Sequence, residues 1–261
     1  MKKFTKKKKI WRVLSIMLPT LLLIVVALVI VGKSNAKTMN ACADAAMATL
    51  EENHSLIKLD NPKYDVVTIK GMTFYTEHYK AEGIGHVAVM KLDATVMQML
   101  TIVITPTEKN IPLMSVDYIY MPGMRKAYVE YYDLVDNKDE TYMINMDKLD
   151  TIRDAYSDLP DTQPTSGWYD DLITVATYKK GGKDTQLLSM LTDNLNQYLQ
   201  IADELPILSF EEQESNRAIT QDYTDKLVDL GGVATNQFKA ELGAEATREF
   251  LDTVLFGTEI D

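Results

Sequence analysis

The first feature in the pattern of hydrophobic and polar positions is a long uncharged run near the N-terminus. Residues 13–31, VLSIMLPTLLLIVVALVIV, contain no charged side chain. At about 1.5 Å of rise per residue, a helix of this length covers the roughly 30 Å hydrocarbon layer of a membrane. The pattern therefore predicts one transmembrane helix over 13–31, within which Pro19 can be accommodated.

From Tyr64 onward the chain is rich in β-branched and aromatic residues, arranged in short runs between turn residues. This pattern predicts six strands, over 65–70, 73–79, 85–91, 96–104, 115–120 and 126–133. The connections between them are shorter than the dozen residues that a parallel crossover needs, so we expect an antiparallel meander. The strand over 96–104 is almost continuously apolar, which is typical of a strand covered on both faces.

The last third of the chain has the period of helices. In Thr185–Leu205 the apolar positions recur every three or four residues, which predicts one buried helix face. Ser209 and Glu212 form a capping-box pattern that opens a second helix, ending at Gly231. A third helix is expected over about 244–256. Strands followed by helices around one core predict an α+β fold.

The charges that flank the apolar run predict its orientation. Seven basic residues and no acidic residue precede it, whereas only Lys33 and Lys37 follow it. The positive-inside rule therefore predicts a cytoplasmic tail over 1–12, a single-pass anchor in the cell membrane and an extracytoplasmic C-terminal part. Ser34-Asn35-Ala36 leaves open a second alternative, a cleaved secretory signal. Both alternatives place the rest of the chain outside the cytoplasm.

The remainder divides into a connecting segment and a folded domain. Residues 32–63 are alanine-rich in their first half, which predicts a juxtamembrane helix or stalk, and residues 64–261 are expected to form the domain. Removing the first 37 residues removes nine of the 27 Lys and Arg and none of the 38 Asp and Glu, leaving a formal net charge of −20. Such a surface is expected to repel nucleic acid, anionic lipid and acidic proteins.

Motifs of common enzyme and metal sites are absent from the sequence. It has no P-loop, no dinucleotide fingerprint, no zinc-protease motif and no nucleophile elbow, and its three histidines lack metal-ligand spacing. We therefore expect no metal site. Cys42 is the single cysteine, so no intramolecular disulfide is expected and the core must hold the fold.

One acidic residue lies inside an apolar strand segment. Asp117 is flanked by Val116 on one side and by Tyr118-Ile119 on the other. Burial raises the pKa of a carboxyl group, and a raised pKa suits a general acid. Strand periodicity also allows Asp117 to face solvent from an amphipathic strand, and the residues alone leave both alternatives open.

The stretch Met99–Leu134 contains, in order, L-x-x-V-x-x-P, a loop, P-L-x-x-x-D-x-x, P-G and a strand that ends in Asp. In this order of motifs it resembles the ferredoxin-dependent bilin reductases, which reduce linear tetrapyrroles. Similar fragments follow in the last third, at Tyr198-Leu199, Gln221, Tyr223, 238–242 and 254–256. The similarity covers about 64–256 and lies in ordered spacing and short fragments.

The resemblance implies a three-layer α/β/α fold in which an antiparallel sheet lies between helices and bilin binds between the sheet and the C-terminal helices. It also implies that no metal or organic cofactor is bound, that ferredoxin supplies electrons and that protein carboxyl groups supply protons. Asp117 falls at the family's proton-donating aspartate, and Asp193 is the nearest candidate for a second acid in the C-terminal helical part. Thr101, Arg125 and Trp168 are the expected ligand-binding residues; Thr101 stands where the family has His or Asn and cannot supply a proton near neutral pH.

Two function hypotheses follow. The first is a membrane-tethered, extracytoplasmic domain that binds, and with a suitable donor reduces, a linear tetrapyrrole or similar planar apolar ligand. The net charge of −20 disfavours an acidic ferredoxin as that donor, although basic residues cluster at 125–126 and 179–183. The second is a non-catalytic surface or interaction module that keeps the fold. An open cleft at Asp117 would favour the first hypothesis, and a space filled by Met and Tyr side chains would favour the second.

Overall fold

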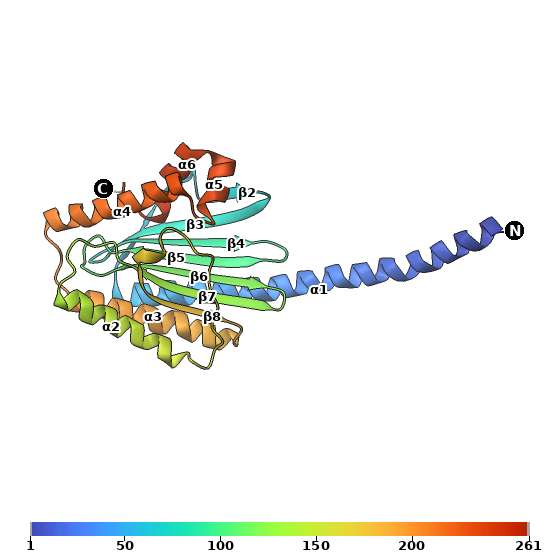
Figure 1. Cartoon of the computed structure of the whole chain (residues 1–261), viewed down its shortest axis with the longest axis horizontal. Helices are drawn as coiled ribbons and strands as arrows, with labels where there is room; N and C mark the ends of the chain where they lie inside the picture. The colour runs from blue at the N-terminus through green and yellow to red at the C-terminus, as the bar shows by residue number, and fades with distance from the viewer. Residues whose placement is uncertain (1, 260–261) are drawn as a thin grey trace.

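The structure is a computed structural model that describes residues 2–259, with side chains described from Met17 onward. Its longest element, helix α1 (Lys2–Asn53), projects from the domain over its N-terminal half (Figure 1). Among the described residues, α1 is the one helix that is long and apolar enough to cross a membrane. The side chains of the expected cytoplasmic tail and of 13–16, and residues 260–261 of the expected domain, lie outside the described part.

Eight strands in the described part of the chain form a single antiparallel sheet, in the order β1-β3-β4-β5-β6-β7-β8, with β2 also paired to β3. Their bounds are β1 Leu56–Leu59, β2 Val66–Ile69, β3 Met72–Ala81, β4 Gly85–Asp93, β5 Gln98–Thr105, β6 Leu113–Met121, β7 Met124–Tyr132 and β8 Ile173–Lys180. The six predicted strands and their antiparallel order are confirmed as β2 to β7. The two strands that were not predicted, β1 and β8, lie at the edges.

Five further α-helices are described: α2 Glu140–Ala155, α3 Asp184–Glu204, α4 Phe210–Leu230, α5 Thr235–Leu242 and α6 Ala244–Phe250. The predicted second helix is confirmed as α4, where Ser209 N donates to Glu212 Oε2 at 2.8 Å. The predicted first helix is confirmed as α3. The third divides into α6 and one π-helical turn, η2 (Leu251–Leu255). Helices α2 and α5 were not predicted.

Helices cover both faces of the sheet, as Figure 1 shows. Helices α1, α2 and α3 pack on one face, here called the α3 face, where strand residues such as Val116 and Val129 are buried. Helices α4 to α6 and η2 pack on the other, the α4 face, where Val103 and Tyr132 are buried. Successive strand residues alternate between the two faces. The expected α+β fold with helices on both faces is present.

The segment after the apolar run belongs to the folded domain. In α1 a row of mostly small or apolar side chains, three or four residues apart, is buried against β5, β6 and α3: Asn35, Met39, Cys42, Ala43, Ala46 and Leu50. The predicted juxtamembrane helix is therefore present to Asn53, but it packs in the core of a domain that was expected to begin at 64. Alanine favours a helix, and on one helix face it also permits close packing on a sheet.

Candidate functional site

Thr101 of β5 and Asp117 of β6 lie opposite each other on the α4 face of the sheet. The Thr101 hydroxyl donates a hydrogen bond to Asp117 Oδ1 at 2.5 Å. On the other side of Asp117, its cross-strand partner in β7 is Tyr128, and Glu130 lies diagonally two residues further along the same face. The sheet register thus brings together the two predicted residues Thr101 and Asp117 and adds Glu130.

Asp117 and Glu130 form a pair of recessed carboxyl groups. Burial raises the pKa of Asp117, and the hydrogen bond from Thr101 lowers it in part. Burial also raises the pKa of Glu130; a hydrogen bond that Tyr132 donates at 2.7 Å opposes the rise, and the nearby charge of Asp117 adds to it. A carboxyl group with a raised pKa keeps its proton to higher pH, which is what proton donation requires.

Glu130 was not predicted as a site residue. The sequence marks it only as a polar position in a partly alternating run, two residues from Tyr128 and from Tyr132. That spacing places the three residues on one face of a strand. It does not reveal that this face is shared with Asp117, because the pairing register between β6 and β7 decides which faces coincide.

Aromatic side chains surround the two carboxyl groups. Tyr128 and Tyr178 form an edge-to-face pair with ring centroids 5.6 Å apart, and Tyr178 lies diagonally across from Glu130 on the same face of the sheet. Trp168 and Tyr169 come from the connection between α2 and β8 and reach the same side of the sheet. Aromatic walls around polar groups are typical of pockets for planar ligands.

The space between the sheet and α4 is occupied by rings. Tyr223 of α4 has ring centroid distances of 5.5 Å to Tyr132, 5.8 Å to Trp168 and 5.6 Å to Phe256. Trp168 Nε1 donates to the carbonyl oxygen of Gly231 at 2.8 Å, which attaches this segment to the end of α4. The predicted ligand-binding residue Trp168 therefore lies on the α4 face, packed against Tyr223. A hollow of about 540 Å³ lies elsewhere, between α1 and the β3 edge.

Arg125 does not join Asp117. It pairs with Tyr120 across β6 and β7, so it lies on the α3 face, where its guanidinium is 6.0 Å from the Tyr120 ring centroid. Its Nε forms an ion pair with Asp184 at 2.6 Å. Arg125 is three residues from Tyr128 and five from Glu130 along β7, so its side chain is on the opposite face of the strand.

Asp193 also lies apart from Asp117. It is exposed on α3, which covers the opposite face of the sheet, and its carboxylate accepts a hydrogen bond from Tyr156. The structure therefore does not bring Asp193, the candidate for a second acid, next to Asp117. Asp193 belongs to the helical third of the chain, but that third contributes helices to both faces of the sheet, and its position in the sequence does not indicate which face it is on.

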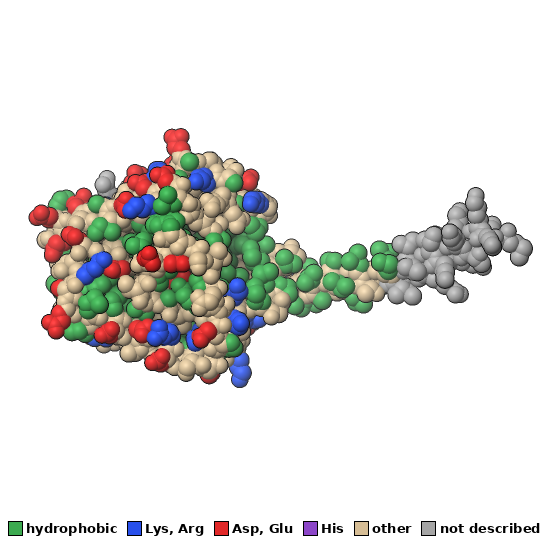
Figure 2. Space-filling model, in the orientation of Figure 1, with side chains coloured by type: hydrophobic (Ala, Val, Ile, Leu, Met, Phe, Trp, Pro, Cys, Tyr) green, Lys and Arg blue, Asp and Glu red, His purple; other side chains and the backbone are tan. Residues whose placement is uncertain are grey.

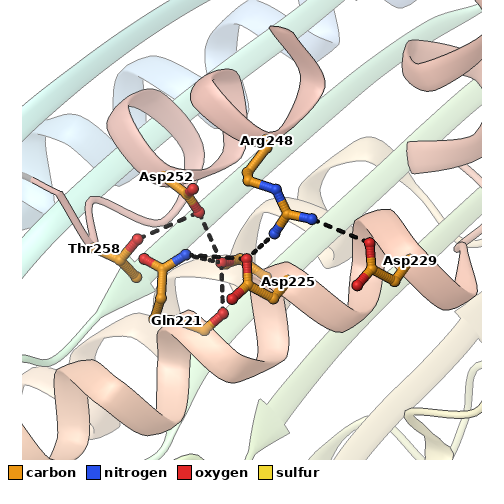
Figure 3. A network of polar contacts seen from close by, with 7 residues as sticks. Gln221, Asp225, Asp229, Arg248, Asp252 and Thr258 are labelled. Atoms are coloured by element: carbon orange, nitrogen blue, oxygen red, sulfur yellow. Dashed lines mark hydrogen bonds and ion pairs between the residues drawn. The ribbon is translucent and has the colours of Figure 1, made fainter. Parts of the chain in front are cut away.

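A different carboxyl group of the C-terminal helices is buried on the Asp117 side. Asp252 of η2 is 2% exposed and accepts hydrogen bonds from Thr224 at 2.7 Å and from Thr258 at 3.4 Å (Figure 3). Beside it, Arg248 of α6 pairs with two acidic residues of α4, Asp225 and Asp229. These contacts fix the π-helical turn to α4. Sequence reasoning missed Asp252 because its spacing gives no sign of burial.

Within the described residues, no group of three or more His, Cys, Asp or Glu side chains could hold a metal ion. His78 and His86 form a buried pair on β3 and β4, with His78 Nδ1 3.2 Å from His86 Nε2. Burial lowers the pKa of both, that of His86 to about 3, so both are neutral near neutral pH.

The fold is an antiparallel sheet between two layers of helices, and one face of the sheet carries the two acids Asp117 and Glu130. No protein-family model matches the chain, and no curated protein sequence matches it. Among solved structures, phytochromobilin synthase from tomato in complex with biliverdin is similar, with a TM-score of 0.62, 13% identity and coverage of 81% of each chain. That enzyme is a ferredoxin-dependent bilin reductase. The resemblance inferred from the sequence is confirmed at the level of the fold.

Proposed function

We propose that this protein is a membrane-tethered, extracytoplasmic domain that binds a linear tetrapyrrole, or a similar planar apolar ligand, over the α4 face of its sheet. The observation that carries the proposal is the recessed Asp117, hydrogen-bonded to Thr101 and walled by aromatic rings. Rings stack on a planar ligand, and the carboxyl groups can hydrogen-bond its pyrrole nitrogens or carbonyl oxygens. The bilin-reductase fold supports the choice of ligand.

Asp117 is the proposed proton donor to the bound ligand. Reducing one double bond of a tetrapyrrole consumes two electrons and two protons. The O–H bond of neutral Asp117 breaks as its proton passes to the ligand, and Glu130 is the second acid on the same face. Raised pKa values keep both groups supplied with protons. The electrons must come from a separate one-electron donor, either a redox protein or a small reductant.

Ligand entry on this face requires a rearrangement. Trp168 and Tyr169 lie where the ligand would pack, and one hydrogen bond, from Trp168 to Gly231, holds the indole in place. Both side chains are only partly buried and come from a long connection between α2 and β8. Loops of this kind cover many ligand sites and open on the microsecond-to-millisecond timescale. We therefore assign the Trp168-Tyr169 segment the role of a cover.

The tether is α1. Its exposed apolar stretch follows a strongly basic start of the chain, which supports an anchor with a cytoplasmic N-terminus. Protease added to intact cells should then digest the domain. Protection of the domain until the cells are lysed would reverse this orientation.

A second candidate, the non-catalytic interaction module, is favoured by one observation. The rings of Tyr132, Tyr169, Tyr223 and Trp168 already contact one another between the sheet and α4. If the cover never opens, the protein keeps the fold and has no ligand. The two candidates differ in whether added bilin changes anything on the Asp117 face.

The proposed role of Asp117 is tested by reduction of biliverdin under anaerobic conditions, with the full chain in nanodiscs and a chemical one-electron donor. Asp117→Asn keeps size and hydrogen bonding but removes the proton, so binding should persist and reduction should slow by about 100-fold or more. The matched control is Asp193→Asn, an exposed aspartate on the other side of the sheet, which should leave the rate unchanged. Equal rates for Asp117→Asn and the unmodified chain would exclude Asp117 as the donor.

A further inference from the structure

The end of the domain where α1 leaves is level with the end of the apolar run. Gly32 directly follows Val31 and packs on the β4–β5 turn so closely that a Cβ atom at Gly32 would lie 2.4 Å from the carbonyl oxygen of Thr95. Asn35, one turn further along α1, is already buried. If 13–31 spans the membrane, as proposed above, no flexible linker separates it from the sheet. The turns at this end then lie at the level of the lipid headgroups.

Lysines without an acidic partner gather at this same end. The turns β2–β3, β4–β5 and β6–β7 and the end of β8 all lie at the end of the sheet from which α1 emerges (Figure 1), and several basic side chains lie at this end in Figure 2. Six lysines of α1 and of these turns form no ion pair with any described residue: Lys33, Lys37, Lys70, Lys126, Lys180 and Lys183. Elsewhere on the surface five lysines are paired with Asp or Glu, namely Lys58, Lys63, Lys138, Lys148 and Lys226. Lys80 of β3 and Lys91 of β4 form no ion pair with a described residue.

The acidic groups at this end are mostly engaged. Asp184 pairs with Arg125 at 2.6 Å, and Asp161 pairs with Lys179 at 2.7 Å. Asp93 and Asp158 are exposed and form no ion pair with a described residue; they accept hydrogen bonds from Gln98 and Gln186, respectively. The end of the domain where α1 emerges is therefore locally positive, although residues 38–261 carry a net charge of −20.

Exposed apolar residues lie in the turns at the same end of the domain as the lysines. Val96, in the β4–β5 turn that touches α1, is 43% exposed, and Pro122 of the β6–β7 turn is also exposed. Lysines with long aliphatic stems beside exposed apolar residues are typical of surfaces that lie on a membrane interface.

We propose that this helix-exit face, made of the six lysines and Val96, binds anionic phospholipid headgroups of the membrane that holds α1. Charge complementarity and continuity with the apolar helix both point to lipid as the occupant. The sequence predicted repulsion from anionic lipid because net charge ignores where the charges lie. The same geometry places Lys126, Lys180 and Lys183 beside the bilayer, so a soluble acidic electron carrier cannot dock on them.

Lipid enrichment around the full chain tests this proposal. The full chain with Pro122→Cys carries a fluorescent donor in the β6–β7 turn, and Cys42, 1% exposed, stays unlabelled. Vesicles of phosphatidylcholine with about one quarter phosphatidylglycerol contain an acceptor on the acyl chain of either lipid. Energy transfer to labelled phosphatidylglycerol should exceed transfer to labelled phosphatidylcholine by about twofold, and the excess should vanish near 0.5 M salt.

Two charge-matched variants separate a local effect from net charge. The helix-exit variant combines Lys70→Gln, Lys126→Gln, Lys180→Gln and Lys183→Gln, and the control combines Lys58→Gln, Lys138→Gln, Lys148→Gln and Lys226→Gln. The first should lose the preference for phosphatidylglycerol, and the second should keep it. Equal transfer to both lipids in the unmodified chain, or an equal loss in both variants, overturns the proposal. Failure of the anchor itself would be distinct, because the chain would not sediment with vesicles at all.

Discussion

At the scale of single residues, Asp117 and Glu130 occupy positions that favour a neutral carboxyl group over a charged one. The folded-state pKa of each is raised, so between the unfolded pKa and the folded pKa the native state binds more protons than the unfolded state. Stability is therefore full at pH values below the unfolded pKa, near 4, and falls as pH rises through the raised folded pKa. This is opposite to the behaviour of a carboxylate in a salt bridge.

Asp117→Asn removes one of these titrating groups while keeping an acceptor for the Thr101 hydroxyl. We expect the variant to unfold with a free energy higher than that of the unmodified chain by on the order of 1 kcal/mol at pH 7, and to show no gain near pH 4. Denaturant unfolding of the full chain at several pH values measures the difference. Asp193→Asn, exposed on α3, should stay within about 0.5 kcal/mol throughout. A gain at Asp117 that does not change with pH would contradict this account of the site.

At the scale of elements, α1 has one stretch outside the domain and one that packs in its core. The stretch 17–31 is apolar and mostly exposed, whereas the second half of the helix contributes Ala46, fully buried, to the core beside the sheet. Ala48, two residues later on the same helix, is exposed. The face of α1 that packs is thus defined by small side chains, which carry no strong hydrophobic signal in the sequence.

Ala46→Asp should destabilise the domain by about 3 kcal/mol or more, because it buries an unpaired charge. Ala48→Asp makes the same chemical change on the exposed face and should cost less than about 1 kcal/mol, chiefly through helix propensity. Thermal unfolding of the full chain in nanodiscs compares the two. Equal losses of stability in the two variants would indicate that residues 32–63 form a stalk outside the core.

The strands β1 and β8 and the helix α2, which the sequence did not predict, have weak local hydrophobic patterns. β1 and β8 are edge strands, and β1 has only four residues, so long-range pairing with β3 and β7 defines them more than local pattern does. In α2 the buried positions include the polar Asn145 beside Tyr142 and Met146, which blurs the apolar stripe. The central strands and the capped helices were predictable because local pattern and tertiary packing agree there.

At the scale of the whole molecule, the sequence predicted the fold and the apolar helix but not the sides on which residues meet. Asp117 and Thr101 were predictable together, since they fall at matching places in the resemblance to bilin reductases. Arg125, Asp193 and Glu130 were not, because strand register and the choice of helical layer decide their faces. Net charge likewise predicted a uniformly repulsive domain, whereas the fold places unpaired lysines where α1 emerges. Net charge sums all charged residues, whereas the fold decides which of them lie together on the surface.

The absorption spectrum of biliverdin, titrated with the full chain in nanodiscs, tests the central claim most directly. A ligand bound over the α4 face should show a shifted absorption band that saturates at one ligand per chain. Asp117→Asn should alter the position of that band, because the carboxyl group next to the ligand is lost, and Asp193→Asn should leave it unchanged. A spectrum identical to that of biliverdin with empty nanodiscs, or one that both variants alter alike, would contradict a bilin site at Asp117.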